Sequence, residues 1–117
     1  MSGITSYHAG LSAEGAVERH YARRGLPLAA RRWRGKAGEI DLILRAGRAL
    51  VFVEVKKARD HARAAASLRP RQMARLMAAA EEYLSGEREG LATPCRFDVA
   101  LVDGAGRIEI VENALGH

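Results

Sequence analysis

The segment over residues 38–56, GEIDLILRAGRALVFVEVK, restricts the fold of this chain more than any other stretch. Apolar residues alternate along the segment on both sides of Ala46–Gly47, and both halves are rich in strand-forming side chains. Alternation on either side of a short turn is typical of a β-hairpin. We therefore expect two antiparallel strands here, with helices packed against the sheet that they join.

Helical and extended segments flank this hairpin. Ser12 as a cap and Gly25 as a stop predict a helix over residues 12–24, with Glu14 in its first turn and a loose lead-in over residues 1–10. The arginine-rich segment from Pro27 to Trp33 predicts an edge strand. Residues 57–70 are expected to form a basic mobile loop, and a helical turn at its alanines is an alternative. A helix is expected over residues 70–84, followed by strands over residues 96–103 and 107–112.

This order of elements, αβββαββ, predicts a single domain over residues 1–117. The expected architecture is an α/β three-layer sandwich, in which a mixed sheet of about five strands is flanked by helices.

Charge and composition narrow the function. Nineteen Lys and Arg against fourteen Asp and Glu give a net charge of +5 and a pI near 10.0. A basic surface attracts phosphate backbones, although arginines also simply keep proteins soluble. The single cysteine, Cys95, excludes a Cys-based zinc site within one chain and suits a reducing cytoplasm. No apolar run reaches the roughly 18 residues of a spanning helix, and no signal peptide is visible, so we expect a cytoplasmic protein outside the membrane.

The hairpin groups charged side chains on one face of the sheet. Folding it around Ala46–Gly47 predicts three cross-strand pairs: Arg45 with Arg48, Asp41 with Phe52, and Glu39 with Glu54. Because side chains alternate faces along a strand, four of them then project from the same side: Glu39, Asp41, Glu54 and Lys56.

Three acids on one face repel one another, and a divalent cation relieves that repulsion. Carboxylates suit hard ions such as Mg²⁺ or Mn²⁺, which activate water for attack on a phosphodiester. Lys56 can hold the nucleophile or neutralise charge on the phosphate. The alternative is that Glu54 and Lys56 are solvated residues of a strand, which is the commoner role of such a pair.

Several motifs resemble an uncharacterised bacterial family of the YraN type over nearly the whole chain. They are G-E-I-D-L-I at 38–43, V-F-V-E-V-K at 51–56, R-P-R-Q-M-A-R-L at 69–76 and P-C-R-F-D-V at 94–99. That family is in turn similar to the PD-(D/E)xK superfamily, which holds restriction endonucleases and archaeal Holliday-junction resolvases. The resemblance implies a restriction-endonuclease-like fold.

The resemblance also implies roles. Asp41 and Glu54 match the metal ligands and Lys56 the catalytic lysine of the superfamily. Glu14 matches an additional ligand or water-orienting base, the alternative being an acid that stabilises the helix dipole. Gln72 matches a glutamine that helps to fix the lysine, or it is a solvated first-turn residue. Glu39 is either a ligand in place of Glu14 or a surface acid.

Two departures from the superfamily pattern stand out. Ile40 replaces the proline of the superfamily name, and the K-A-R sequence at 57–59 differs from the usual pattern, which puts the basic role of Arg59 in doubt.

Basic segments on both sides of the acidic hairpin predict contacts to a phosphate backbone, and therefore recognition of shape rather than base sequence. The predicted nucleic-acid-binding residues are Arg31, Arg32, Arg34, Lys36, Lys57, Arg59 and Arg71. Trp33 either stacks on an unpaired base or anchors the core.

The expected function is that of a metal-dependent nuclease acting on DNA, with branched or damaged structures as candidate substrates. The alternatives are a non-cleaving nucleic-acid-binding module and a scaffold for protein partners. Resolvases of the superfamily act as dimers, so the resemblance also raises a homodimer, although no apolar patch in the sequence identifies an interface.

Overall fold

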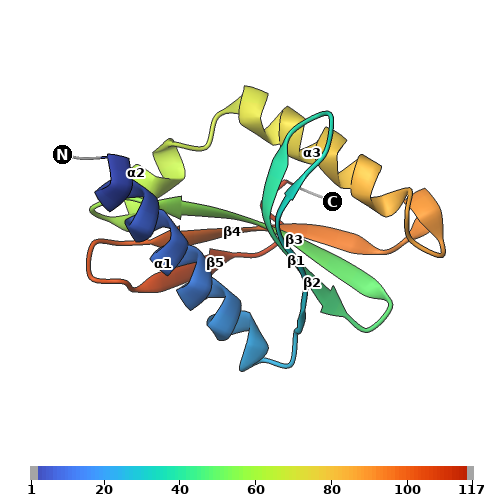
Figure 1. The fold of residues 1–117 in the computed structure, drawn as a ribbon, viewed down its shortest axis with the longest axis horizontal. Coiled ribbons are helices and arrows are strands. Elements are labelled where there is room, and N and C mark those ends of the chain that lie inside the picture. Colours follow the sequence, from blue (N-terminus) through green and yellow to red (C-terminus); the bar gives the residue numbers. More distant parts are fainter. Residues whose placement is uncertain (1–2, 116–117) are drawn as a thin grey trace.

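A five-stranded sheet lies between two layers of helix in the computed structural model, which describes residues 3–115 and, for residues 3–11, the backbone alone (Figure 1). The elements are α1 (Gly3–Ala22), β1 (Leu28–Arg34), β2 (Glu39–Ala46), β3 (Ala49–Lys57), α2 (His61–Ala66), α3 (Pro70–Leu84), a 3₁₀ turn η1 (Gly90–Ala92), β4 (Cys95–Val102) and β5 (Ile108–Val111). This arrangement is the predicted three-layer α/β sandwich.

The sheet is mixed, and its strand order β1-β2-β3-β4-β5 follows the chain. Strands β1–β2, β2–β3 and β4–β5 pair antiparallel, whereas β3 and β4 pair parallel. A parallel pair needs a long crossover, and here α2 and α3 supply it. Strand β1 lies at one edge, as its arginine-rich sequence predicts.

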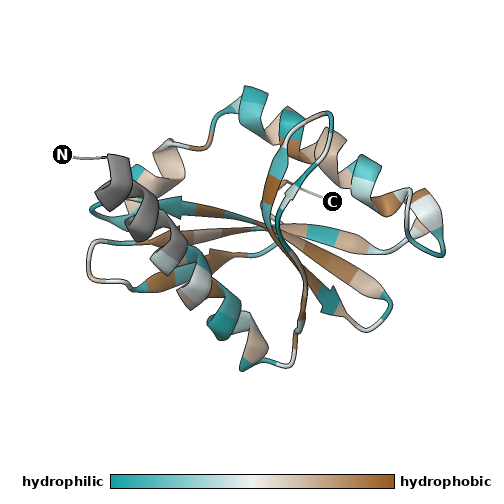
Figure 2. Ribbon diagram, in the orientation of Figure 1, coloured by the Kyte–Doolittle hydropathy of each residue, from teal (hydrophilic) through white to brown (hydrophobic). Residues whose placement is uncertain are grey.

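Each face of the sheet has its own apolar core. On one face, Val17 and Tyr21 of α1 pack against Leu42, Leu44 and Val53. On the other face the buried residues of α3 pack against the aromatic side chains of the sheet, and the main contributors are Leu76, Ala80, Leu84, Phe52 and Phe97. Figure 2 shows apolar residues concentrated along the central strands, which is why these strands read as nearly continuous apolar runs.

Helix α1 begins earlier than predicted. It starts at Gly3, so the expected lead-in over residues 1–10 is helical from residue 3, and Ser12 lies inside the helix instead of capping it. No proline interrupts this stretch, and an established helix extends by one hydrogen bond per added residue. The predicted stop is confirmed: Gly25 has φ +83°, and the Leu26 amide donates to the Tyr21 carbonyl at 3.1 Å in a Schellman motif.

A second correction concerns the segment predicted as a basic loop over residues 57–70. Strand β3 runs to Lys57, and α2 occupies the middle of the segment, so the element order is αβββααββ. Asp60 caps α2 by accepting a hydrogen bond from the Arg63 amide at 2.8 Å, and Ala64 is fully buried. A helix of six residues is too short to show a helical period in the sequence.

The hairpin register also differs from the prediction. The turn centres on Gly47–Arg48, with Gly47 at φ +62°, a conformation that glycine adopts without steric cost. The observed pairs are Ala46 with Ala49, Arg45 with Leu50, Leu44 with Val51, Ile43 with Phe52, and Leu42 with Val53. The predicted partners of Asp41 and Glu39 are therefore wrong by two residues. The alternation of side chains also breaks near Asp41, since Ile40 and Ile43 both pack on the α3 side of the sheet while Leu42 packs on the α1 side.

No helix among the described residues is both long and apolar enough to cross a bilayer.

Candidate active site

The two strands of the hairpin separate at Asp41. Their pairing ends with Leu42 and Val53, after which β2 continues with β1 as far as the pair Arg34–Glu39, and β3 continues with β4. The Asp41 side chain lies in this fork, where its Oδ2 accepts a hydrogen bond from the Val55 amide at 2.8 Å. The divergence of the strands thus places a carboxylate against the backbone of the neighbouring strand.

Glu54 is the buried centre of the site, with 7% of its surface exposed. Its Oε2 lies 3.4 Å from the Lys56 ammonium nitrogen and accepts a hydrogen bond from the Gln72 side-chain amide. Glu54 also shares a hydrogen bond with Asp41. Side chains from β2, β3 and α3 therefore meet at one carboxyl group.

Burial is the largest influence on the charge of Glu54. Burial, together with the hydrogen bond and negative charge of Asp41, raises the pKa of Glu54 to about 8, although Lys56 acts in the opposite direction. The surroundings of Glu54 therefore favour the protonated form of its carboxyl group beside Asp41.

Helix α1 brings a third acid to this cluster. Burial and the charge of Asp41 raise the pKa of Glu14, whereas the nearby Arg32 lowers it. The Arg32 Nε lies 3.6 Å from Glu14 Oε1 and 3.6 Å from Glu39 Oε1. Glu39 also pairs with Arg34 at 3.1 Å, so arginines surround it.

Arg32 adopts an unusual backbone conformation, with φ +51° in the middle of β1. A left-handed conformation costs a non-glycine residue about 1–2 kcal/mol. The register pairs Arg31 with Leu42 and Trp33 with Ile40, which leaves Arg32 opposite Asp41. The strained residue is thus the one that carries positive charge to the acid cluster.

The donor set at the fork fits a hard divalent cation in number and kind. Asp41 and Glu54 supply two adjacent carboxyl groups, and Mg²⁺ is commonly held by one or two carboxylates with waters and substrate oxygens. Among the side chains that the structure describes, those of residues 12–115, no group of three or more His, Cys, Asp or Glu is placed to hold a metal ion. Glu14 is the nearest candidate for a third ligand because its carboxylate is close enough to Asp41 to feel its charge.

The structure separates the alternatives for several predicted residues. Glu14 lies well inside α1, so it does not stabilise a first-turn dipole. Gln72 contacts Glu54 instead of only solvent. Trp33 packs edge-on against Tyr83 with ring centroids 5.4 Å apart, which is the contact of a core anchor. Glu39 does not lie opposite Glu54, and its partner in the sheet is Arg34.

The predicted basic residues fall into two groups. Arg31 is held by Glu18 of α1 through two contacts of 3.0 and 3.1 Å, and Arg32 and Arg34 pair with acids near the site. The other members, Lys36, Lys57, Arg59 and Arg71, are exposed, as the first three are. Lys57 and Arg59 lie at the end of β3, whereas Lys36 lies in the loop between β1 and β2.

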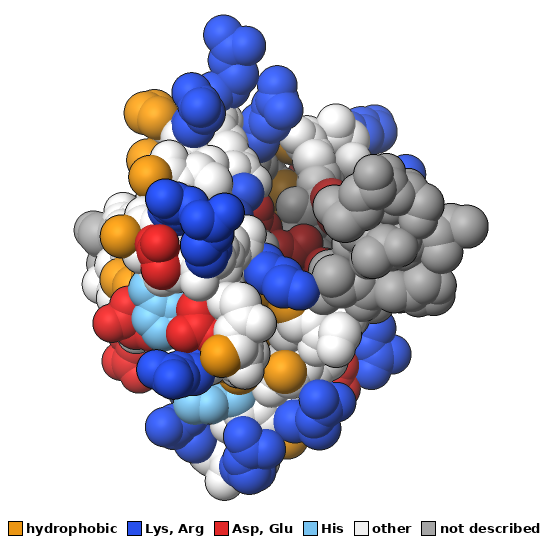
Figure 3. Space-filling model, turned by 90° about the vertical axis from the view of Figure 1, so that its left-hand side faces the viewer, with side chains coloured by type: hydrophobic (Ala, Val, Ile, Leu, Met, Phe, Trp, Pro, Cys, Tyr) orange, Lys and Arg blue, Asp and Glu red, His pale blue; other side chains and the backbone are white. Residues whose placement is uncertain are grey.

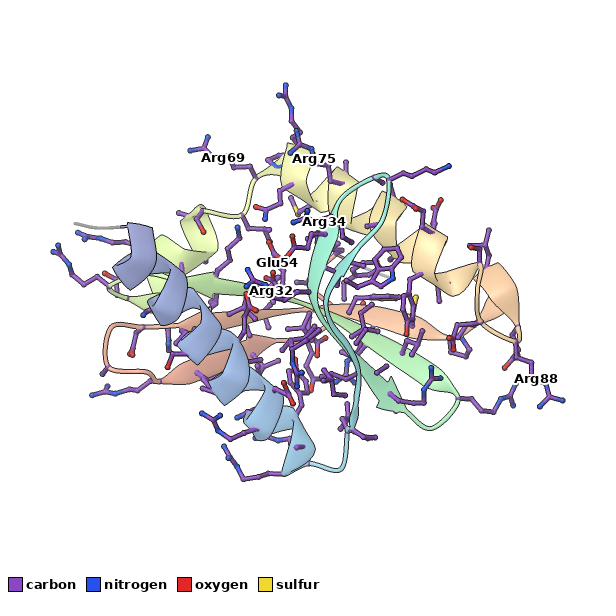
Figure 4. All side chains as sticks on the ribbon, viewed as in Figure 1. Arg32, Arg34, Glu54, Arg69, Arg75 and Arg88 are labelled. Atoms are coloured by element: carbon purple, nitrogen blue, oxygen red, sulfur yellow. The ribbon has the colours of Figure 1, made fainter. Side chains whose placement is uncertain are left out.

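Arg69, at the N-cap of α3, and Arg75, within that helix, are exposed as well. Arg75 follows Arg71 by four residues, so both lie on the same side of α3, a helical spacing that is visible in the sequence. In Figure 4, Arg69 and Arg75 point away from the sheet, while Arg32 and Glu54 lie inward between α1 and α3. Figure 3 shows acidic side chains deep in the centre of this face, with Lys and Arg side chains around them.

Comparison with known proteins places the chain in a family. The model of the uncharacterised protein family UPF0102 matches residues 13–102, a range that contains every candidate site residue. A UPF0102 protein of Ruegeria pomeroyi is 63% identical over 115 residues, which cover 98% of this chain and 94% of that protein. A UPF0102 protein of Cereibacter sphaeroides is 61% identical over 97% of both chains, and one of Roseobacter denitrificans is 53% identical over 99% of this chain and 90% of its own. The chain therefore belongs to the uncharacterised protein family UPF0102, which confirms the predicted YraN-type resemblance.

Proposed function

We propose that this protein is a metal-dependent nuclease that cleaves phosphodiester bonds in DNA on a restriction-endonuclease-like fold. The observation that carries the proposal is the meeting of Asp41, Glu54 and Lys56 at the fork between β2 and β3. The Asp and the E-x-K pair of the PD-(D/E)xK superfamily have this order in the chain. Gln72 and Glu14 approach the same point from separate helices, as the resemblance implies for both.

Asp41 and Glu54 would hold a Mg²⁺ or Mn²⁺ ion, which supplies an activated water and stabilises negative charge on the phosphate. Lys56 adds a positive charge on the same face, where it can orient the attacking water or neutralise a phosphate oxygen. Gln72 fixes the orientation of Glu54 by donating to its Oε2, so the carboxyl group is held in place before substrate arrives.

A basic wall beside the acids supports a nucleic-acid substrate. Exposed arginines of α3 line one side, and the loop between β1 and β2 brings Lys36 next to them. This loop is fixed to α3 because the Glu82 carboxylate accepts hydrogen bonds from the amides of Lys36 and Ala37 at 3.0 and 2.7 Å. A rigid row of cations suits a phosphate backbone.

The shape of the site also favours a polymer over a small molecule. The cavity of about 10 Å³ that touches Glu54 is a small void lined mainly by core residues such as Ile40, Phe52 and Leu76. Two much larger hollows, of about 530 and 540 Å³, lie at the β2–β3 turn and beside Tyr21 and Arg96. Small-molecule sites usually enclose several hundred Å³, and neither of these two hollows is lined by Asp41, Glu54 or Lys56, which favours an extended polyanion held by the flanking cations.

Cleavage assays over a panel of substrates test this function. Labelled single-stranded, duplex and branched DNA, with matching RNA, are incubated with the full chain in Mg²⁺, Mn²⁺ or EDTA. We expect metal-dependent cleavage by the wild type and none by Asp41→Asn, while Glu112→Gln, which alters an exposed acid, retains wild-type activity.

Two results would redirect the assignment. Equal cleavage by wild type and Asp41→Asn would show that the activity does not come from this site. Salt-sensitive binding without cleavage, unchanged in Asp41→Asn, would identify the protein as a non-cleaving nucleic-acid-binding module.

A further inference from the structure

Arg32 combines a rare backbone conformation with a central position. Among the described non-glycine residues, positive φ values occur at Arg32 and Asn113, and only the first of these lies in a strand. A left-handed residue breaks the regular alternation of side chains along a strand, and such residues persist where the surrounding structure holds them. The register leaves Arg32 opposite Asp41, beside the fork of the hairpin.

The guanidinium group of Arg32 bridges acids from two different elements. Its Nε lies 3.6 Å from Glu14 of α1 and 3.6 Å from Glu39 of β2, and 38% of its side-chain surface is exposed. A cation held by Asp41 and Glu54, with Glu14 as its third ligand, would compete with this guanidinium for the Glu14 carboxylate.

These two contacts are long for ion pairs of arginine. Charge-assisted hydrogen bonds usually measure about 2.7–2.9 Å, and the neighbouring Arg31 meets Glu18 at 3.0 and 3.1 Å in a two-point contact. Arg32 is held to Glu14 and Glu39 more loosely than Arg31 is held to Glu18. A phosphate offers arginine a two-point contact that these two ion pairs do not provide.

We propose that Arg32 is a built-in counter-ion of the metal site: it neutralises Glu14 and Glu39 while the cation is absent, and contacts the substrate phosphate once the cation has replaced it. This inference rests on the proposed function, because it requires a cation at Asp41 and Glu54. It makes Arg32 a positioning residue whose charge opposes metal binding and assists binding of the polyanion.

A purely structural role for Arg32 makes a different prediction. If the residue only joins α1 to β2, its removal lowers the melting temperature and leaves the affinity for a metal unchanged. If Arg32 is a counter-ion, its removal should instead raise the affinity for a divalent cation, because the uncompensated acids attract the cation more strongly.

Isothermal titration of the full chain with Mn²⁺, without nucleic acid, separates the two. Arg32→Asn removes the charge, and asparagine tolerates positive φ. We expect Arg32→Asn to bind Mn²⁺ about tenfold more tightly than wild type. Arg32→Lys, which keeps the charge, should remain within about twofold of wild type.

Arg34→Asn is the matched control, since Arg34 lies in the same strand and pairs with Glu39. Its side chain is 80% exposed, so its loss should change Mn²⁺ affinity by less than about twofold. If circular dichroism shows that Arg32→Asn is unfolded, Arg32→Gly takes its place, because glycine adopts this φ without strain.

The contact to phosphate is tested in a Lys56→Ala background, which keeps both candidate ligands and is expected to be inactive. Fluorescence anisotropy of a labelled DNA duplex in Mn²⁺ should show that adding Arg32→Asn weakens binding about tenfold. An unchanged duplex affinity would overturn this half of the proposal.

The outcomes of the titration are distinct. Equal Mn²⁺ affinities of wild type and Arg32→Asn would overturn the counter-ion role and leave the proposed nuclease standing. Mn²⁺ binding by Arg32→Asn alone would support the counter-ion role strongly. Absence of Mn²⁺ binding from wild type and from Arg32→Asn would overturn the inference together with the metal site of the proposed function.

Discussion

The two ends of the β2–β3 hairpin arrange their charged side chains in opposite ways. At the turn, the arginines lie near the surface and each meets its own acid: Arg45 pairs with Glu87 at 3.0 Å, and Arg48 pairs with Glu89 at 2.8 Å. At the open end the strands separate, and the carboxyl groups of Asp41 and Glu54 contact each other. Opposite charges are paired at the turn, whereas acidic groups lie next to each other at the open end.

This difference shows where the fold tolerates an arrangement that stability does not favour. Exposed ion pairs contribute little to the free energy of folding and little to catalysis. Buried carboxyl groups that share a proton cost free energy, and they are typical of sites that bind or react. The core continues through both ends, since Leu50 and Phe52 pack against α3 as Val51 and Val53 pack on the other face. We therefore predict that activity resides at one end of the hairpin only.

The largest effect is expected from Glu54→Gln. The amide removes a candidate ligand but resembles the protonated carboxyl group in shape, so cleavage should fall about a thousandfold while the melting temperature does not fall. Cleavage assays and calorimetry measure the two quantities on the same preparation. The matched variant at the turn, Glu89→Gln, should retain full cleavage activity. A loss of activity in both variants would contradict the asymmetry of the hairpin.

Gln72→Ala should have the next largest effect. Loss of its hydrogen bond leaves Glu54 free to turn, so cleavage should fall about 10- to 100-fold with bound metal weakened in proportion. Glu81→Ala changes an exposed residue of the same helix outside the basic row and controls for disturbance of the helix. Mn²⁺ titration and cleavage rates test the variant. A wild-type Mn²⁺ affinity together with a wild-type cleavage rate would mean that Gln72 only packs beside the site.

The basic row on α3 should contribute to binding through charge alone. Replacement of Arg71 or Arg75 by alanine should weaken DNA binding several-fold and reduce the slope of log K against log salt by about one for each phosphate that the variant no longer neutralises. Arg88 lies at the far end of the molecule in Figure 4, so Arg88→Ala should leave that slope unchanged. Anisotropy titrations over a range of salt concentrations measure the slopes, and equal slopes for all three variants would place the DNA elsewhere.

The smallest effect is expected at the turn. Arg48→Ala removes an exposed ion pair, and the free energy of unfolding should fall by no more than about 1 kcal/mol. Cleavage should be unaffected. Urea denaturation detects the change in stability. A decrease well above this value would show that the pair with Glu89 fixes the segment after α3, and that the turn supports the fold more than an exposed ion pair can.

Parts of the fold followed from local patterns. Strands β1 to β5 and helix α3 were predictable because their apolar residues repeat with the period of the element, and the stop at Gly25 followed from its freedom to adopt a positive φ. The start of α1 was not predictable, because Ser12 resembles a cap wherever it stands. Helix α2 was predicted only as an optional helical turn at the alanines, because Asp60 and a single buried alanine, Ala64, stabilise it.

The candidate site was predictable in composition but not in arrangement. The alternation of strand residues predicted that Asp41, Glu54 and Lys56 lie together, and they do so where the two strands separate, although the predicted register is wrong by two residues. Nothing in the sequence showed that β2 and β3 separate after Leu42. Beyond that separation, the β1–β2 loop is attached to Glu82 of α3, a contact between residues far apart in the chain.

The sequence by itself determined the layers of the fold, the family, and the residue types that can bind a cation, because each depends on periodicity or on a local motif. Only the tertiary structure decided which acids meet, how Glu54 is buried, and that Arg32 bridges Glu14 and Glu39. These properties join side chains from α1, β1, β2, β3 and α3 that lie far apart in the chain. Their charge states depend on burial and distance, which are set when the helices close on the sheet.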